Sequence, residues 1–368
     1  MEVRNNYNEC ITNLACSIQK YFGIEPKHNT IDCIDKILNE KQPKNVVMIL
    51  FDGMGARILD RALEENSFFR KNKLKDITTV FPATTTAATT SIITGLNPVE
   101  HGWLGWNMYI KPINKTITLF KNQVKGTEKV SHKFLEVKHM LKIETITEQI
   151  NKNGKYKSKM IYPFGEDKYT NIDNMFEKIK KECEKTGKKY IYAYNEEPDG
   201  TMHMKGPDNN ITEKLINTIN RKTEEFCKRL KDTIVIIIAD HGHKLVEPIY
   251  LDEYPEILKM LERTPSLEQR AISFKVKEKY KNEFQEKFRR TLGNDMKLYS
   301  KQEIIESKLF GYGKPNELFE DALGDYIAIA YETGKCIVSS GDDVYISHHA
   351  GYSDDEIYVP LIVIDKCS

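Results

Sequence analysis

Five short and almost wholly apolar runs recur along this chain of 368 residues, and stretches with helical spacing of apolar residues separate them. The runs are Val46–Phe51, Met160–Tyr162, Tyr190–Tyr194, Thr233–Ala239 and Val359–Ile364. Runs of this kind are typical of strands that are covered on both faces. Because strands that alternate with helices favour parallel pairing, we predict an α/β fold: a doubly wound, mostly parallel sheet with helices on both faces.

We expect a core domain and two further segments, one before it and one inserted into it. Residues 1–42 have helical spacing, and we predict two helices there that pack on the main body as an N-terminal extension. Residues 43–249 and 341–368 are expected to form the core domain. The charged and mixed segment 250–340 is expected to form a small inserted α+β cap, with strands at 271–276 and 326–330 and helices at 277–292 and 301–307.

Composition excludes several classes of protein. Lys and Arg number 55 against 54 Asp and Glu, so the net charge of +1 gives no general attraction for a nucleic-acid polymer. The longest apolar runs have about six residues, far fewer than a membrane span needs. The N-terminus lacks the residue order of a secretory signal, which predicts a cytoplasmic protein. Seven scattered cysteines without a CxxC pair indicate neither a disulfide framework nor a thiolate zinc site.

Acidic residues and histidines follow the apolar runs directly. Because the carboxyl ends of parallel strands meet at one edge of the sheet, we expect these side chains to converge there. An aspartate at a strand end is also a common helix N-cap, so each residue alone is weak evidence and the joint pattern carries the argument. The six candidates are Asp52, Asp199, His203, Asp240, His241 and His349. Mixed carboxylate and imidazole ligands suit Zn²⁺ first and Mn²⁺ next, and six suffice for two ions with open positions.

A threonine-rich segment after Phe81–Pro82 offers a nucleophile near the same edge. Pro82 ends an extended segment, and Gly95 and Pro98 are typical of a helix end, so a helix is predicted between them. A threonine in its first turn would meet the positive end of the helix, which favours phosphate binding and formation of an alkoxide. The residues alone leave open which threonine this is, since most of them would simply cap the helix or fill its faces.

Taken in order, these motifs resemble the nucleotide pyrophosphatase/phosphodiesterase branch of the alkaline phosphatase superfamily. The resemblance extends from about residue 44 to residue 364 and rests on Asp52–Gly53, Phe81–Gly102, Glu196–Pro207, Asp240–Gly242 and His349. It implies an alkaline phosphatase-like fold and a site for two divalent ions, with Zn²⁺ expected and Mn²⁺ as the alternative.

The resemblance also implies roles for individual residues. Counting back from Thr94–Gly95 puts the nucleophile at Thr85, with Thr84 and Thr86 one residue away on either side. Asn107 would donate to a phosphate oxygen that the ions do not reach, although a plain loop residue is the alternative there.

Two groups of metal ligands follow from the same resemblance. Asp52, Thr85, Asp240 and His241 would hold one ion. Asp199, His203 and His349 would hold the other. His348 is the alternative to His349, because Ala350 departs from the His-Gly pattern of the family. We interpret His243, just beyond the Asp240–His241 pair, as a surface or core histidine.

The implied function is hydrolysis of phosphodiester or pyrophosphate bonds in small phosphorylated substrates, in particular nucleotide derivatives, through a covalent intermediate on Thr85 that water then cleaves. Thr86 stands where an aromatic residue often follows the nucleophile, so the selection of a base stays open. Another stacking wall could come from Trp103, Trp106 and Tyr352.

Two other functions compete with this one. A phosphomonoesterase or phosphonate hydrolase of the same superfamily would use the same ions. Monoester enzymes usually supply a further positive group, and the nearest arginine to the motifs, Arg57, is expected on the helix after Asp52. A metal-dependent nucleotide-binding protein without turnover is the third possibility, but binding alone would need no hydroxyl nucleophile.

Overall fold

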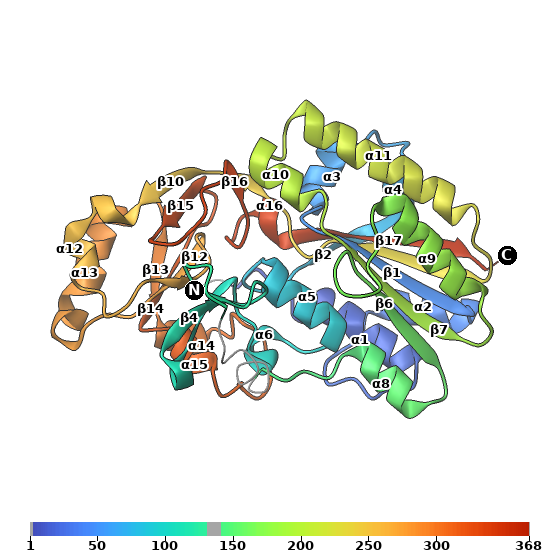
Figure 1. The fold of residues 1–368 in the computed structure, drawn as a ribbon, viewed down its shortest axis with the longest axis horizontal. Helices are drawn as coiled ribbons and strands as arrows, with labels where there is room; N and C mark the ends of the chain where they lie inside the picture. Colours follow the sequence, from blue (N-terminus) through green and yellow to red (C-terminus); the bar gives the residue numbers. More distant parts are fainter. Residues whose placement is uncertain (1–2, 131–140, 368) are drawn as a thin grey trace.

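A six-stranded sheet lies at the centre of the computed structural model, which describes residues 3–130 and 141–367 (Figure 1). In order across the sheet, its strands are β2 (Lys73–Thr78), β17 (Tyr358–Lys366), β8 (Thr233–Ile238), β1 (Asn45–Phe51), β7 (Lys189–Asn195) and β6 (Lys157–Ile161). The last four are parallel to one another, whereas β17 runs antiparallel to both of its neighbours. The predicted mostly parallel sheet is confirmed.

The two strands at one side of this sheet were the hardest to predict. An apolar run does not state its own direction, so the antiparallel orientation of β17 could not be read from Val359–Ile364. Strand β2 is not one of the predicted runs, since Lys73, Lys75 and Asp76 interrupt any apolar pattern. These charges are compatible with a strand because β2 is at the edge of the sheet, where β17 is its one neighbouring strand among the described residues and Cys10 adds an isolated bridge at Thr78.

Helices cover both faces of the central sheet (Figure 1). One layer consists of α1 (Ile11–Tyr21), α2 (Asp32–Lys41), α5 (Thr85–Thr94) and α8 (Ile146–Asn153). Of these, α1 and α2 are the two helices predicted for the N-terminal extension. The other layer contains α3 (Ala56–Ala62), α4 (Phe68–Asn72), α9 (Ile172–Glu184) and α11 (Asn210–Cys227). Helix α1 packs directly on α5, so the N-terminal extension supports the threonine-rich helix from behind.

A second, seven-stranded sheet lies beside the first. Its order is β13 (Lys297–Ser300), β14 (Tyr326–Ile329), β12 (Ala271–Phe274), β11 (Ser266–Leu267), β3 (Asn107–Ile110), β4 (Lys115–Thr118) and β5 (Gln123–Val124). All of its pairings are antiparallel. The sheet extends the cap expected at 250–340, because β3–β5 come from 107–124, a segment expected in the core domain.

Further helices around the second sheet are α12 (Pro255–Leu258), α13 (Lys281–Leu292), α14 (Lys301–Glu306) and α15 (Phe319–Ala322), with 3₁₀ turns at Lys111–Ile113, Leu251–Glu253 and Glu278–Tyr280. Two short helices contact elements of the half around the central sheet: α6 (Pro98–His101) contacts α5, and α16 (Asp354–Ile357) contacts α3 and β17. Strand β10 (Glu247–Tyr250) pairs with β15 (Lys335–Val338), and β9 (Lys244–Leu245) pairs with β16 (Ser347–His348). The β9–β16 pair brings the segment around His349 back to the end of β8.

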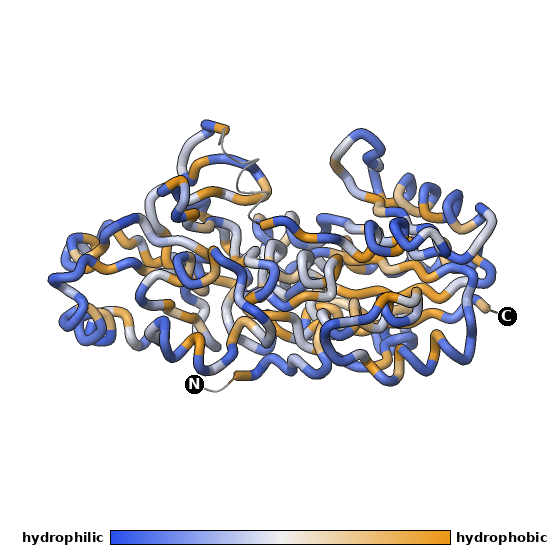
Figure 2. The backbone as a smooth tube through the Cα atoms, turned by 90° about the horizontal axis from the view of Figure 1, so that it is seen from below, coloured by the Kyte–Doolittle hydropathy of each residue, from blue (hydrophilic) through white to orange (hydrophobic). Residues whose placement is uncertain are grey.

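The core follows the two sheets. Apolar stretches run along the strands through the middle of the molecule, and hydrophilic residues cover the outer helices (Figure 2). Strands β1 and β8 are buried along their whole length, which explains their unbroken apolar sequence. Among the described residues, no helix combines the length and the apolar character needed to cross a membrane.

Candidate metal centre and nucleophile

The ends of three parallel strands meet at the candidate site. Asp52 follows β1, Asp240 follows β8, and Asp199 begins α10 (Asp199–Lys205) after β7. Gly53 has φ +72°, and a Cβ atom there would lie 3.0 Å from the Cβ of Asp199. Glycine therefore lets the backbone after Asp52 turn against Asp199, and this turn brings carboxylates from separate parts of the chain together.

Four side chains gather closely at the end of β1. Nε2 of His241 lies 3.2 Å from Oγ1 of Thr85, 3.3 Å from Oδ1 of Asp52 and 3.5 Å from Oδ2 of Asp240. Oγ1 of Thr85 is 3.5 Å from Oδ1 of Asp52. Four ligands at about 2.0 Å from a tetrahedral zinc ion are about 3.3 Å from one another. The printed distances among these four residues, 3.2–3.5 Å, are of the size expected between ligands of one ion. Ligand atoms of Asp52, His241 and Asp199 also lie within 4.8 Å of one another, so Asp199 borders this group too.

A second group surrounds Asp199. Ligand atoms of Asp199, His203, His243 and His349 all lie within 4.8 Å of one another. Nε2 of His243 is 2.5 Å from Oδ1 of Asp199, and Nε2 of His203 is 3.5 Å from Oδ2. Of the two interpretations given for His243, surface or core, the core one holds, because its ring is fully buried, and this ring also contacts the candidate ligand Asp199. The position of His243 two residues after His241 was the signal available in the sequence.

The ring orientation of the histidines favours metal binding. Nδ1 of His203, His241 and His349 lies 2.9–3.2 Å from the backbone oxygens of Ser347, Gly242 and Ala83, in that order. A carbonyl oxygen can only accept a hydrogen bond, so in each of these rings Nδ1 carries the proton. Nε2 is left with its lone pair directed at the carboxylates. Such a second contact is what orients histidine ligands in metal proteins.

The buried carboxylates of the site have negative charge that a bound cation would compensate. Burial and the neighbouring charges of Asp240 and Asp199 raise the pKa of Asp52 well above its usual value, and burial raises the pKa of Asp240 as well. Burial works against ionisation of Asp199 too, but His203 and His243 hold its pKa below the usual range. Oδ1 of Asp240 accepts from the backbone of Gly53 and His241, while buried Oδ2 has no hydrogen-bond partner among the described residues. A divalent ion would compensate these charges.

Of the three candidate threonines, the structure directs Thr85 at this group. Thr84 is the N-cap of α5, but its hydroxyl donates to Glu268 at 2.6 Å. The hydroxyl of Thr86 is buried without a hydrogen-bond partner among the described residues. Thr85 is the first residue of α5, so its side chain lies at the positive end of the helix dipole.

His349, rather than His348, lies in the candidate ligand group around Asp199. Nε2 of His349 is 4.0 Å from Oδ1 of Asp199, and its ring stacks on His241 with centroids 3.9 Å apart. His348 instead packs against His203 and Tyr345, with centroids 5.1 and 5.4 Å away. Ala350 adopts φ +77° directly afterwards, so this chain places an alanine in a left-handed turn where the family pattern has glycine.

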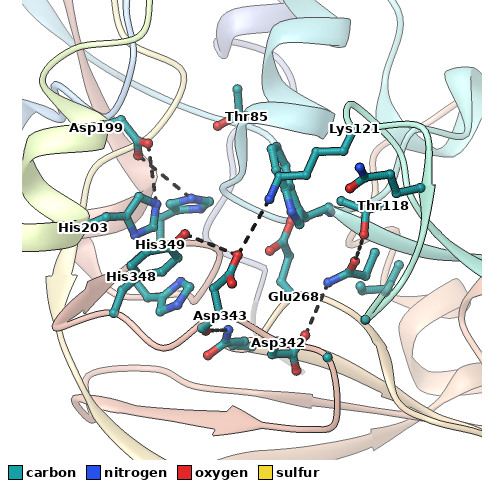
Figure 3. Close-up of a pocket in the computed structure, with 18 of the residues that line it drawn as sticks. Thr85, Thr118, Lys121, Asp199, His203, Glu268, Asp342, Asp343, His348 and His349 are labelled. Carbon is teal, nitrogen blue, oxygen red and sulfur yellow. Dashed lines mark hydrogen bonds and ion pairs between the residues drawn. The ribbon is translucent and has the colours of Figure 1, made fainter. Parts of the chain in front are cut away.

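A cavity of about 970 Å³ opens beside Thr85 (Figure 3). Asn107 lines it and begins β3, so it is not a plain loop residue. Its side-chain oxygen accepts from Thr118 at 2.7 Å, and its amide group donates to Asp342 at 3.4 Å. Trp106 also lines the cavity, whereas Tyr352 is fully buried against Phe81. A stacking wall involving Tyr352 is therefore excluded.

Acidic residues outnumber lysines and arginines in the lining of the cavity. Lys121 is the one lysine or arginine among the described residues that line it, and its Nζ is 3.8 Å from Oδ2 of Asp343. Asp342 is paired with Lys125 at 2.8 Å, and both side chains are almost fully buried. The carboxyl of Glu268 contributes a further acidic group to the wall.

This fold, with two ligand groups at the strand ends, is that of the alkaline phosphatase superfamily. The chain belongs to the type I phosphodiesterase/nucleotide pyrophosphatase family, whose model matches residues 46–353. It is therefore a member of a family of phosphoric ester hydrolases. None of the curated proteins matches the chain.

Solved structures with the same fold have low sequence identity to this chain. Murine ectonucleotide pyrophosphatase/phosphodiesterase 5, as an inactive variant in complex with AMP, is 20% identical, with a TM-score of 0.65 over 86% of this chain and 87% of that one. Phosphonoacetate hydrolase from Sinorhizobium meliloti, in complex with phosphonoacetate, is 14% identical, with a TM-score of 0.62 over 87% of this chain and 90% of that one.

Proposed function

We propose that this protein hydrolyses phosphodiester or pyrophosphate bonds in nucleotide-type substrates, with Thr85 as the nucleophile and two divalent ions, Zn²⁺ or else Mn²⁺, in the site. One observation carries the proposal: the Thr85 hydroxyl, at the start of α5, lies 3.2 Å from Nε2 of His241 and 3.5 Å from Oδ1 of Asp52. A hydroxyl in such a setting is arranged to lose its proton and attack.

Each part of the site would have a separate task. Asp52, Thr85, Asp240 and His241, which meet around Nε2 of His241, would hold one ion. Asp199, His203 and His349 would hold the other, with His243 as a further ligand or as a partner of Asp199. When bound, the ions supply positive charge that favours the Thr85 alkoxide and neutralises phosphate oxygens. The N–H groups in the first turn of α5, which the Thr84 side chain does not cap, would donate to the phosphate that Thr85 attacks. Asn107, which lines the same cavity, would donate to another of its oxygens.

The charge of the cavity supports a diester rather than a monoester. A phosphomonoester carries an additional negative charge, and Lys121, the lining lysine, is already paired with Asp343. Glu268, Asp342 and Asp343 would oppose further negative charge. The volume of about 970 Å³ leaves room for a group of nucleotide size beside Thr85. Binding of AMP by the similar murine protein agrees with this substrate class.

We expect the zinc-reconstituted protein to hydrolyse a nucleoside 5′-aryl phosphodiester at least about tenfold faster, in kcat/KM, than the matching aryl monoester. A tenfold ratio corresponds to about 1.4 kcal/mol at the transition state. The measurement is release of the aryl alcohol, with chelator-stripped protein as the control and with phosphonoacetate assayed for phosphate release in parallel.

Each other outcome changes the assignment. A monoester preference would contradict the diester proposal and indicate a phosphatase. Turnover of phosphonoacetate alone would indicate a phosphonate hydrolase. Phosphonoacetate hydrolase from Sinorhizobium meliloti, which has a similar fold, makes this the main alternative. Zinc binding without turnover of any of the three substrates would favour a binding protein.

A further inference from the structure

Glu268 connects two parts of the proposed site that belong to different elements. Its Oε1 accepts a hydrogen bond of 2.6 Å from the hydroxyl of Thr84 and another of 2.6 Å from the backbone N–H of Trp106. Thr84 directly precedes Thr85, and Trp106 directly precedes Asn107. A single carboxylate oxygen therefore holds the neighbours of the proposed nucleophile and of the proposed phosphate donor.

Thr84 uses its hydroxyl in an unusual way. A threonine at the N-cap of a helix commonly accepts a hydrogen bond from the N–H groups of the first turn. Thr84 makes no such contact and donates to Glu268 instead. Among the described residues, the Thr84 side chain thus leaves the first-turn N–H groups uncapped, while the start of α5 is attached to the second sheet.

The backbone around Glu268 is built for this contact. Leu267 adopts φ +70°, a left-handed conformation that is costly for a leucine, and it pairs with Asn107 of β3. Gly105 approaches it so closely that a Cβ atom there would lie 3.0 Å from the Leu267 Cα atom. Strain of this kind persists where the surrounding structure enforces it, and here it brings the Glu268 carboxyl into a buried position against α5.

We propose that Glu268 is a positioning residue that fixes Thr85 and Asn107 relative to each other. The inference rests on the proposed function, because it concerns the placement of the same nucleophile. Glu268 acts through Thr84 and Trp106, so its removal displaces the reacting groups without removing a metal ligand. A displacement of about 1 Å costs on the order of 10²-fold in rate.

An amide can replace the carboxyl in this role. Burial raises the pKa of Glu268 to about 7, so neither contact is confined to the charged form, and a glutamine oxygen accepts the same two hydrogen bonds. A residue that acted on the substrate through its charge or its proton would not be replaceable in this way.

The test compares Glu268→Ala and Glu268→Gln in the zinc-reconstituted full chain. We expect Glu268→Ala to lower kcat about 10²-fold with KM within about threefold of wild type, and Glu268→Gln to retain kcat within about fivefold. Bound zinc should be unchanged in both. Glu286→Gln is the matched control, since this exposed glutamate lies on α13 at the far end of the second sheet (Figure 1).

A second variant covers the case in which Glu268→Ala does not fold. Thr84→Val removes one of the two contacts and should by itself lower kcat about tenfold. If Glu268→Ala does fold, adding Thr84→Val to it should cause no further loss of kcat, because the shared contact is already gone. The inference is overturned if Glu268→Ala or Thr84→Val retains the kcat of an active wild type, or if Glu268→Gln is as impaired as Glu268→Ala. A wild type without turnover would overturn the proposed function, and the positioning role with it.

Discussion

Replacing Thr85 with alanine is expected to lower kcat by on the order of 10⁴-fold or more, because removal of a covalent nucleophile leaves only the binding and charge stabilisation of the site. The metal content should stay close to that of wild type, since Asp52, Asp240 and His241 remain to hold the ion. The measurement is steady-state hydrolysis of the nucleoside aryl diester, together with zinc quantification on the same preparation.

The neighbouring threonine supplies a matched control. Thr86→Val keeps the shape of a buried side chain whose hydroxyl has no hydrogen-bond partner among the described residues. It should leave kcat within about threefold of wild type. Full activity of Thr85→Ala combined with loss of activity in Thr86→Val would move the nucleophile by one residue and would contradict its placement at Thr85.

Asp240→Asn should have opposite effects on activity and on metal-free stability. We expect kcat to fall by on the order of 10³-fold, because the first ion loses a charged ligand worth several kcal/mol. The chelator-stripped variant should nevertheless be more stable to unfolding than stripped wild type by about 2 kcal/mol. Asp52, Asp199 and Asp240 are mutually repulsive when no cation compensates them, and an uncompensated buried charge is destabilising.

Urea unfolding of stripped and zinc-saturated protein measures this second effect. Wild type should gain about 4 kcal/mol when zinc is present at about a thousand times its dissociation constant, and Asp240→Asn should gain much less. Asp173→Asn is the control, because Asp173 forms an ion pair with Lys222 on the surface of the helical layer. A stripped Asp240→Asn protein less stable than stripped wild type would contradict the proposed repulsion between the carboxylates.

The order of the motifs predicted which carboxylates meet at one edge of the sheet. The local pattern of apolar residues located most strands of the central sheet but neither the direction of β17 nor the presence of β2. Asp52, Asp199 and Asp240 each follow an apolar strand, so the rule for parallel sheets brings them to one edge without knowledge of the rest of the chain. We could not predict the antiparallel direction of β17 or the charged edge strand β2, because the direction of pairing and the position at an edge depend on distant parts of the chain.

Tertiary contacts determine the positions of His243 and Glu268, two residues whose contacts in the site the sequence did not predict. His243 lies in a segment held beside Asp199 by the pairing of β9 with β16, a partner about a hundred residues away. Glu268 follows the two-residue strand β11 and reaches α5 because β11 pairs with β3. His243 has only its closeness to the Asp240–His241 pair as a local signal, and Glu268 has none, so only the assembled sheets show what these side chains contact.

Trapping the covalent intermediate would test the role of Thr85 without relying on a loss of activity. Zinc-reconstituted protein would be mixed with the nucleoside aryl diester, quenched in acid within milliseconds, digested and analysed by mass spectrometry. The proposed mechanism predicts a nucleoside monophosphate adduct on the peptide that contains Thr85, located on that residue by fragmentation and absent in Thr85→Ala. Rapid turnover with no adduct even under single-turnover conditions, or an adduct on a different residue, would contradict it.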